Sequence, residues 1–134
     1  MRKKNVFYII LAISAIILVM IITSLLNPLR KSKDEIRENM LNLTPVGTDM
    51  EDVIGIVESN RKWKIKWIDY ERGYVIDKWG TPGENNSIYV GEKSMRVYLG
   101  YYNPIFNTGV SVYYGFGADS KLIDIAVRKD KDSL

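Results

Sequence analysis

A stretch of 21 uncharged residues, positions 6–26, constrains this chain more than any other feature. As an α-helix, at about 1.5 Å per residue, this stretch is about 31 Å long, which matches the hydrocarbon core of a bilayer. It is longer than the apolar segment of a secretory signal peptide and ends without a small-residue cleavage motif. We therefore predict an uncleaved transmembrane signal anchor that ties the remaining residues to one membrane surface.

Basic residues on both sides of the anchor determine its predicted orientation. Arg2, Lys3 and Lys4 precede it and have no acidic neighbours, whereas the basic residues that follow it are interleaved with acidic ones. Since the more positive flank usually stays inside, we predict a cytoplasmic N-terminus and an extracytoplasmic domain. The predicted organisation is a basic flank at 1–5, the anchor at 6–26, a juxtamembrane linker at 27–34 and an α+β domain at 35–134.

The composition of the domain argues against several classes of function. Three of the 19 Lys and Arg precede the anchor, so the remaining 16 balance the 16 Asp and Glu, and the domain lacks the net basic charge that nucleic-acid binding needs. The chain has no cysteine and no histidine, which removes disulfides, the commonest zinc ligands and the commonest general base. Carboxylate pairs such as Asp49 with Asp52, or Asp119 with Asp124, fall at predicted caps and turns. We predict no cofactor, no metal and no enzymatic activity.

Two short helices are predicted at the start of the domain. Ser32 opens a capping-box pattern, and a helix over 33–42 places Ile36, Met40 and Leu43 on one face. A second helix is predicted to begin with Thr48 as the cap of its first turn and to end near residue 60. Its apolar face consists of Met50, Val53, Ile54 and Val57.

From residue 63 the apolar residues recur at every second position, which is typical of strands with one buried face. Trp63, Ile65 and Trp67 are predicted to share such a face, residues 74–78 to form a hairpin with that strand, and residues 88–90 to form a brief edge strand. Three longer strands follow, with apolar faces at Met95, Val97, Leu99 and Tyr101, at Val110, Val112, Tyr114 and Phe116, and at Ile123, Ile125 and Val127. Short links predict an antiparallel meander. The predicted fold is α+β, with the two short helices packed on a sheet of three to five strands.

Two segments of the domain resemble a known family. Residues 47–53, Gly-Thr-Asp-Met-Glu-Asp-Val, and residues 116–125, Phe-Gly-Ala-Asp-Ser-Lys-Leu-Ile-Asp-Ile, are similar to segments of small SmpA/OmlA-type and beta-lactamase-inhibitor-protein-like domains. The resemblance covers residues 35–128 and implies a secreted or membrane-tethered bacterial domain that binds other proteins without catalysis. A membrane helix stands here in place of the lipidated cysteine of the outer-membrane members. The chain also resembles short uncharacterised membrane proteins of Gram-positive bacteria.

Aromatic residues are the feature of the domain that indicates binding. Eight Tyr and three Trp lie in the 108 residues after the anchor, and such side chains are enriched at protein interfaces. Strand alternation places several on the open face of the sheet, where cross-strand pairing is the alternative explanation. The candidate binding face consists of Tyr98, Tyr102 and Tyr113 with Arg96 and Arg128, and of Trp79 at the edge of a polar loop at 80–87.

The sequence therefore predicts a membrane-anchored extracytoplasmic module that binds a protein partner of the cell envelope. Two alternatives remain. A sensor of an envelope ligand or glycan would need an aromatic-lined groove near the loop at 80–87. An immunity or inhibitor-type protein is compatible with the family resemblance.

Overall fold

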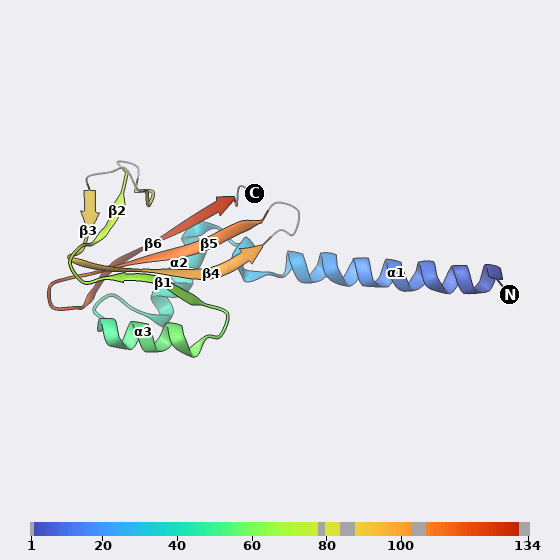
Figure 1. Ribbon diagram of the computed structural model, residues 1–134, viewed down its shortest axis with the longest axis horizontal. Helices are drawn as coiled ribbons and strands as arrows, with labels where there is room; N and C mark the ends of the chain where they lie inside the picture. Colours follow the sequence, from blue (N-terminus) through green and yellow to red (C-terminus); the bar gives the residue numbers. More distant parts are fainter. Residues whose placement is uncertain (1, 78–79, 84–87, 103–106, 132–134) are drawn as a thin grey trace.

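The computed structural model describes residues 2–77, 80–83, 88–102 and 107–131, and its architecture is α+β. A long N-terminal helix, α1 (Arg2–Leu25), projects from one end of a smaller body that contains the other helices and the strands (Figure 1). None of the residues of α1 is buried, and its length and composition are sufficient to cross a membrane. The predicted apolar helix is confirmed as a helix, and the rest of the described chain leaves its surface uncovered.

A short turn joins α1 directly to the domain. Asn27 caps the 3₁₀-helix η1 (Pro28–Arg30), because its side chain accepts a hydrogen bond from the Leu29 N–H (3.0 Å). Leu29 packs against the hydrophobic core. The segment predicted as a linker, residues 27–34, therefore contains η1 and the first residues of the next helix.

The next helix, α2 (Lys33–Leu43), begins as predicted. The Ser32 side chain accepts a hydrogen bond from the first turn (3.2 Å), and Ile36 and Met40 are buried in the core. The predicted burial of Leu43 is wrong, since 51% of its surface is exposed. This side chain faces a groove instead of the sheet.

The third helix, α3 (Met50–Ser59), starts differently from the prediction. Thr48 does not cap it, because its hydroxyl donates to a carbonyl of the preceding turn (2.6 Å), and Asp49 occupies the N-cap position without a side-chain hydrogen bond. The backbone here pairs with a turn of the sheet, where the Met50 N–H donates to the Ser120 carbonyl (2.8 Å). The predicted apolar stripe is confirmed by the burial of Met50, Val53 and Val57.

Four antiparallel strands form the main sheet in the order β1–β4–β5–β6. Their bounds are β1 (Lys64–Asp69), β4 (Lys93–Tyr102), β5 (Thr108–Phe116) and β6 (Leu122–Lys131). The last three are consecutive along the chain, which confirms the predicted meander (Figure 1). β1 pairs with β4 and completes one edge.

The hydrophobic core lies between one face of this sheet and the helices α2 and α3. Every second residue of the central strands points toward the helices, as a half-buried sheet requires. Fully buried sheet residues include Met95, Val97, Val110, Val112, Tyr114, Phe116 and Ile125. The predicted two-layer α+β fold is therefore confirmed.

The strands β2 (Tyr74–Ile76) and β3 (Ile88–Val90) pair with each other in a separate two-stranded ribbon. The predicted hairpin between β2 and β1 is wrong. Close packing of the ribbon on the main sheet explains the difference, because a Cβ added at Gly115 would lie 2.8 Å from the Val90 carbonyl oxygen and 3.0 Å from the Tyr74 ring. Glycine at this position lets the ribbon lie against the sheet face opposite the helices.

Three β-bulges interrupt the alternation of the described strands. β1 moves out of register with β4 at Lys66, β4 moves out of register with β5 at Leu99, and β6 moves out of register with β5 at Ile123. Beyond each bulge the side chains change faces. Trp67 is therefore 38% exposed and lies on the face opposite to Ile65, which contradicts its predicted burial. The predicted place of Ile123 on the apolar face is also wrong, since it is 48% exposed and Leu122 is buried instead.

We predict that replacing Gly115 by Ala lowers the free energy of unfolding by about 2 kcal/mol, because the added methyl group has no space beneath the ribbon. The matched control is Gly55→Ala in α3, where an added Cβ meets nothing within 4 Å. This change should raise stability by about 0.5–1 kcal/mol through helix propensity. Urea unfolding in detergent micelles, followed by near-ultraviolet circular dichroism, measures both. Equal midpoints for the two variants would contradict the packing of the ribbon.

Candidate functional site

The face of the main sheet opposite the helices carries most of the predicted binding residues. The register places Arg96 of β4 opposite Tyr113 of β5. It also places Tyr98 opposite Ser111, and β6 adds Arg128 beside Ser111. Since residues paired across strands share a face, four of the six predicted residues lie together.

Two further residues, both from β1, join this face. Lys66 Nζ lies 5.2 Å from the centre of the Tyr98 ring, and Trp67 contacts Tyr113 edge-on with 6.1 Å between ring centres. Alternation already places Lys66 on the side opposite Ile65, whereas it puts Trp67 in the core, and the bulge brings Trp67 to this face. We call this surface the cationic–aromatic face; it consists of Lys66, Trp67, Arg96, Tyr98, Tyr113 and Arg128.

Both arginines of the cationic–aromatic face are held in place by neighbours. Arg96 donates from Nε and Nη2 to Ser111 Oγ (3.4 and 3.3 Å), and its guanidinium lies 5.5 Å from the Tyr113 ring centre. Arg128 Nε donates to Asp130 Oδ1 (2.7 Å), and this bond raises the pKa of the guanidinium above its ordinary value. Stacked and pre-positioned guanidinium groups bind carboxylates with little further loss of side-chain freedom.

Tyr113 supports this face from beneath. Only 8% of its surface is exposed, because Trp67 and Tyr74 pack against its ring, the latter with 6.0 Å between ring centres. Tyr74 belongs to the ribbon of β2 and β3, which covers this end of the face. The prediction of a fully open sheet face is therefore wrong, and Tyr113 acts as the platform on which Arg96 stacks.

A groove of about 330 Å³ runs between the cationic–aromatic face and the ribbon. The charged residues in its lining are Arg72, Arg96, Arg128 and Asp69, and its aromatic residues are Trp67, Tyr74, Tyr89 and Tyr113. Asp69 accepts hydrogen bonds from two backbone N–H groups of the turn after β1 (2.9 and 3.1 Å). Among the described residues, the three guanidinium groups meet Asp69 in the lining and Asp130, the ion-pair partner of Arg128, so the groove keeps a smaller excess of positive charge, at Arg72 and Arg96.

Two of the predicted residues are not part of this face. Tyr102 lies on the helix side of the sheet, because the bulge at Leu99 reverses the alternation of β4 ahead of it. There it packs against the core, with Lys129 Nζ 4.8 Å from its ring centre. Tyr101, which is 57% exposed, takes the position that the prediction gave to Tyr102. Trp79 lies outside the described residues.

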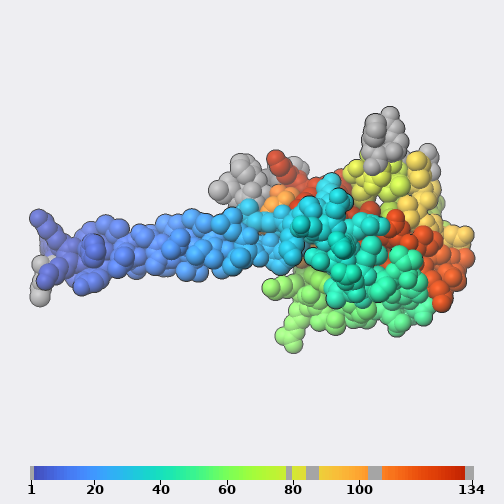
Figure 2. Space-filling view, turned by 180° about the vertical axis from the view of Figure 1, so that it is seen from behind, coloured from blue at the N-terminus to red at the C-terminus, as the bar shows by residue number. Residues whose placement is uncertain are grey.

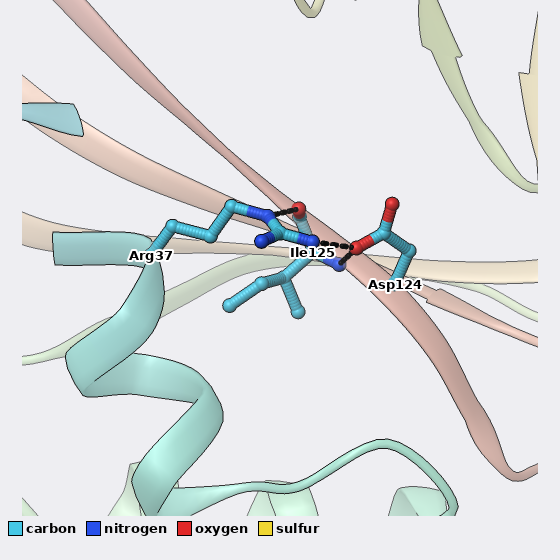
Figure 3. A network of polar contacts seen from close by, with 3 residues as sticks. All are labelled: Arg37, Asp124 and Ile125. Carbon is cyan, nitrogen blue, oxygen red and sulfur yellow. Dashed lines mark hydrogen bonds and ion pairs between the residues drawn. The ribbon is translucent and has the colours of Figure 1, made fainter. Parts of the chain in front are cut away.

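The carboxylates Asp119 and Asp124, considered as a pair for acid–base chemistry, have separate structural partners. Asp124 forms an ion pair with Arg37 of α2 (Figure 3). Arg37 Nε also donates to the Ile125 carbonyl on the edge strand β6 (3.0 Å). Asp119 accepts from the Lys121 N–H in the turn before β6 (3.1 Å). Among the described residues, no group of three or more His, Cys, Asp or Glu side chains is placed to hold a metal ion. The chemistry that the site offers is recognition of negative charge and aromatic contact.

Comparisons of this chain with protein-family models, with curated proteins and with solved structures gave no match. The interpretation of the cationic–aromatic face therefore rests on the contacts of the chain itself. The resemblance to SmpA/OmlA-type and beta-lactamase-inhibitor-protein-like domains stays a prediction.

The side chain of Tyr74 lies between the ribbon and the main sheet. Its hydroxyl makes the free energy of unfolding depend on pH. Burial and, to a smaller extent, the negative charge of Asp124 raise the pKa of its hydroxyl, and Arg37 partly opposes them. In the unfolded chain the same hydroxyl ionises near its ordinary pKa of about 10. Above that pH the folded state binds more protons than the unfolded state, so the free energy of unfolding falls as the pH rises.

We predict that Tyr74→Phe loses less stability than the parent chain between about pH 9 and pH 11, because the titrating hydroxyl is gone. The control is Tyr101→Phe, which removes a hydroxyl from an exposed side chain and should follow the parent. Urea midpoints at the two pH values measure the effect. A parallel decline in all three proteins would show that Tyr74 is not buried in this way.

Proposed function

We propose that this chain is a single-pass membrane-anchored protein whose extracytoplasmic domain binds an acidic surface of an envelope protein. The observation that carries the proposal is the groove at the cationic–aromatic face, where three guanidinium groups meet four aromatic rings. Arg, Tyr and Trp are the residues that most often dominate the binding energy of protein interfaces. In this proposal the domain is a non-catalytic module that works without a cofactor.

The anchor in this proposal is α1. Apolar side chains cover its circumference along most of its length, and the domain buries none of them. Exposure of so much apolar surface to water is unfavourable, whereas a bilayer accommodates it. Arg2, Lys3 and Lys4 favour a cytoplasmic N-terminus, which puts the domain on the outer side.

Charge favours a protein partner over the alternative of an uncharged glycan. Arg128 is paired with Asp130, but Arg72 and Arg96 form no ion pair with a described residue, and Asp69 is the one carboxylate among the described residues of the lining. A negatively charged occupant is therefore complementary to the groove. Asp and Glu side chains of a protein partner supply negative charge at several points, and bidentate hydrogen bonds from arginine fix the orientation of their carboxylates. An uncharged glycan would leave the guanidinium groups without such partners. An immunity or inhibitor-type protein would bind its target through the same kind of contact, so this alternative differs from the proposal only in the identity of the partner.

Photo-crosslinking in intact cells tests the proposal. Trp67 lies in the groove lining and is partly exposed, so a benzophenone amino acid in its place contacts an occupant without removing an arginine. We expect an adduct with one protein partner. Replacing Arg96 and Arg128 together by Gln should reduce its yield at least about tenfold, as expected for residues that dominate an interface.

The control position for crosslinking is Glu58, which is exposed on α3 and lies on the other layer of the domain. A benzophenone there should give no adduct with the same partner. The proposal fails if both positions give the same adduct, or if the yield from position 67 does not change when the two arginines are replaced. Near-ultraviolet circular dichroism of each variant verifies that the fold is retained.

A further inference from the structure

A second groove, at the end of the domain that adjoins α1, has a different character. We infer that it binds one anionic phospholipid of the membrane in which α1 is anchored. The inference rests on the membrane anchorage in the proposed function and assigns a ligand to a second site of the same domain. The position of the groove, its apolar floor and its basic rim each support it.

The groove lies where α1 enters the domain. Its volume is about 920 Å³, which is within the range of ligand sites in proteins. Thr23 of α1 and Leu26 just after this helix line one side, and the turn between α3 and β1 lines another. Figure 2 shows this turn, in light green, projecting beside the base of the blue helix. Because the apolar run ends at residue 26, the groove opens at the level of the lipid headgroups.

Apolar side chains form the floor of this groove and remain exposed. Leu26 is 74% exposed, and Leu43 is 51% exposed. Leu29 and Leu99, which also contact the core, complete the floor. Exposed apolar side chains gathered in one place mark a binding surface. An acyl chain supplies the apolar contact that the described part of the protein does not.

Basic side chains form the rim of the groove. Arg61 and Lys62 lie in the turn between α3 and β1, and neither forms an ion pair with a described residue. Asn60 fixes this turn, since its Oδ1 accepts from the Lys62 N–H (3.0 Å), and Trp63 packs against the core. Among the described residues that line the groove, none is Asp or Glu. The rim thus presents the uncompensated positive charge that attracts an anionic headgroup.

The opposite end of the domain has the reverse charge. Its turns and the start of α3 carry seven acidic residues against the basic residues Arg72, Lys93 and Lys121; the acidic ones are Asp49, Glu51, Asp52, Asp69, Glu71, Glu92 and Asp119. Since the domain as a whole is formally neutral, the basic rim does not follow from overall composition. A domain polarised in this way is attracted to an anionic bilayer by the end that α1 holds there.

Native mass spectrometry tests the inference on the full chain, ejected from nanodiscs that contain equal amounts of phosphatidylcholine and phosphatidylglycerol. The parent should retain one phosphatidylglycerol with at least about tenfold preference, because each basic side chain near an anionic lipid contributes about fivefold. Replacing Arg61 and Lys62 together by Gln should bring the two lipids close to equal retention. Leu43→Glu, which puts a negative charge on the floor, should also lower phosphatidylglycerol retention.

The matched control replaces Lys93 and Lys121, two cations at the opposite end of the domain, by Gln. This control variant removes two positive charges, as the variant at Arg61 and Lys62 does, and should keep the preference of the parent for phosphatidylglycerol. Equal retention of both lipids by the parent, or an unchanged preference after loss of Arg61 and Lys62, would overturn the inference. The mass of the chain recovered from cells separates the two proposals. A chain without residues 1–26 contradicts both the anchorage and the groove, whereas a full-length chain without the preference contradicts the groove alone.

Discussion

The helix α1 is long and apolar enough to cross a membrane, and none of its residues is buried by the domain that follows. Its connection to that domain is short, with only Leu26 and Asn27 between α1 and η1. Arg30 of η1 donates back to Ser24 Oγ at the end of α1 (2.9 Å), and Leu29 enters the core. In the proposed anchorage, the domain therefore begins within about one helical turn of the membrane surface. This proximity gives its two ends different surroundings.

The arrangement of the sheet follows from the same connection. The strands β4, β5 and β6 run roughly along the axis of α1 (Figure 1). One face of the sheet is occupied by α2 and α3, and the other carries the cationic–aromatic face. With α1 anchored as proposed, both faces would be turned along the plane of the bilayer, so the proposed partner would approach from beside the domain while the basic end faced the lipid surface.

Sequence patterns predicted the elements wherever an apolar period extended over many residues, as in α1 and the three-stranded meander, even though bulges interrupt the meander. The candidate face was predicted only in part, because single inserted residues at Lys66 and Leu99 exchange the two faces of a strand. Gly100, beside the bulge at Leu99, has a φ of +125°, which favours glycine. A glycine inside a predicted strand is therefore the sequence signal for this bulge, and the bulge determines on which face of the sheet Tyr102 lies. The position of the ribbon depends on a long-range contact at Gly115, and no local pattern reports such a contact.

Placement of the domain outside the cytoplasmic membrane is the central claim, and paired cysteine labelling tests it most directly. The chain has no native cysteine, so Asn5→Cys ahead of the apolar run and Glu58→Cys on the exposed side of α3 report separately on its two ends. With a membrane-impermeant maleimide, the account predicts labelling of position 58 in intact cells and of position 5 only after lysis. Labelling of position 5 alone in intact cells, or protection of both positions until lysis, would contradict it.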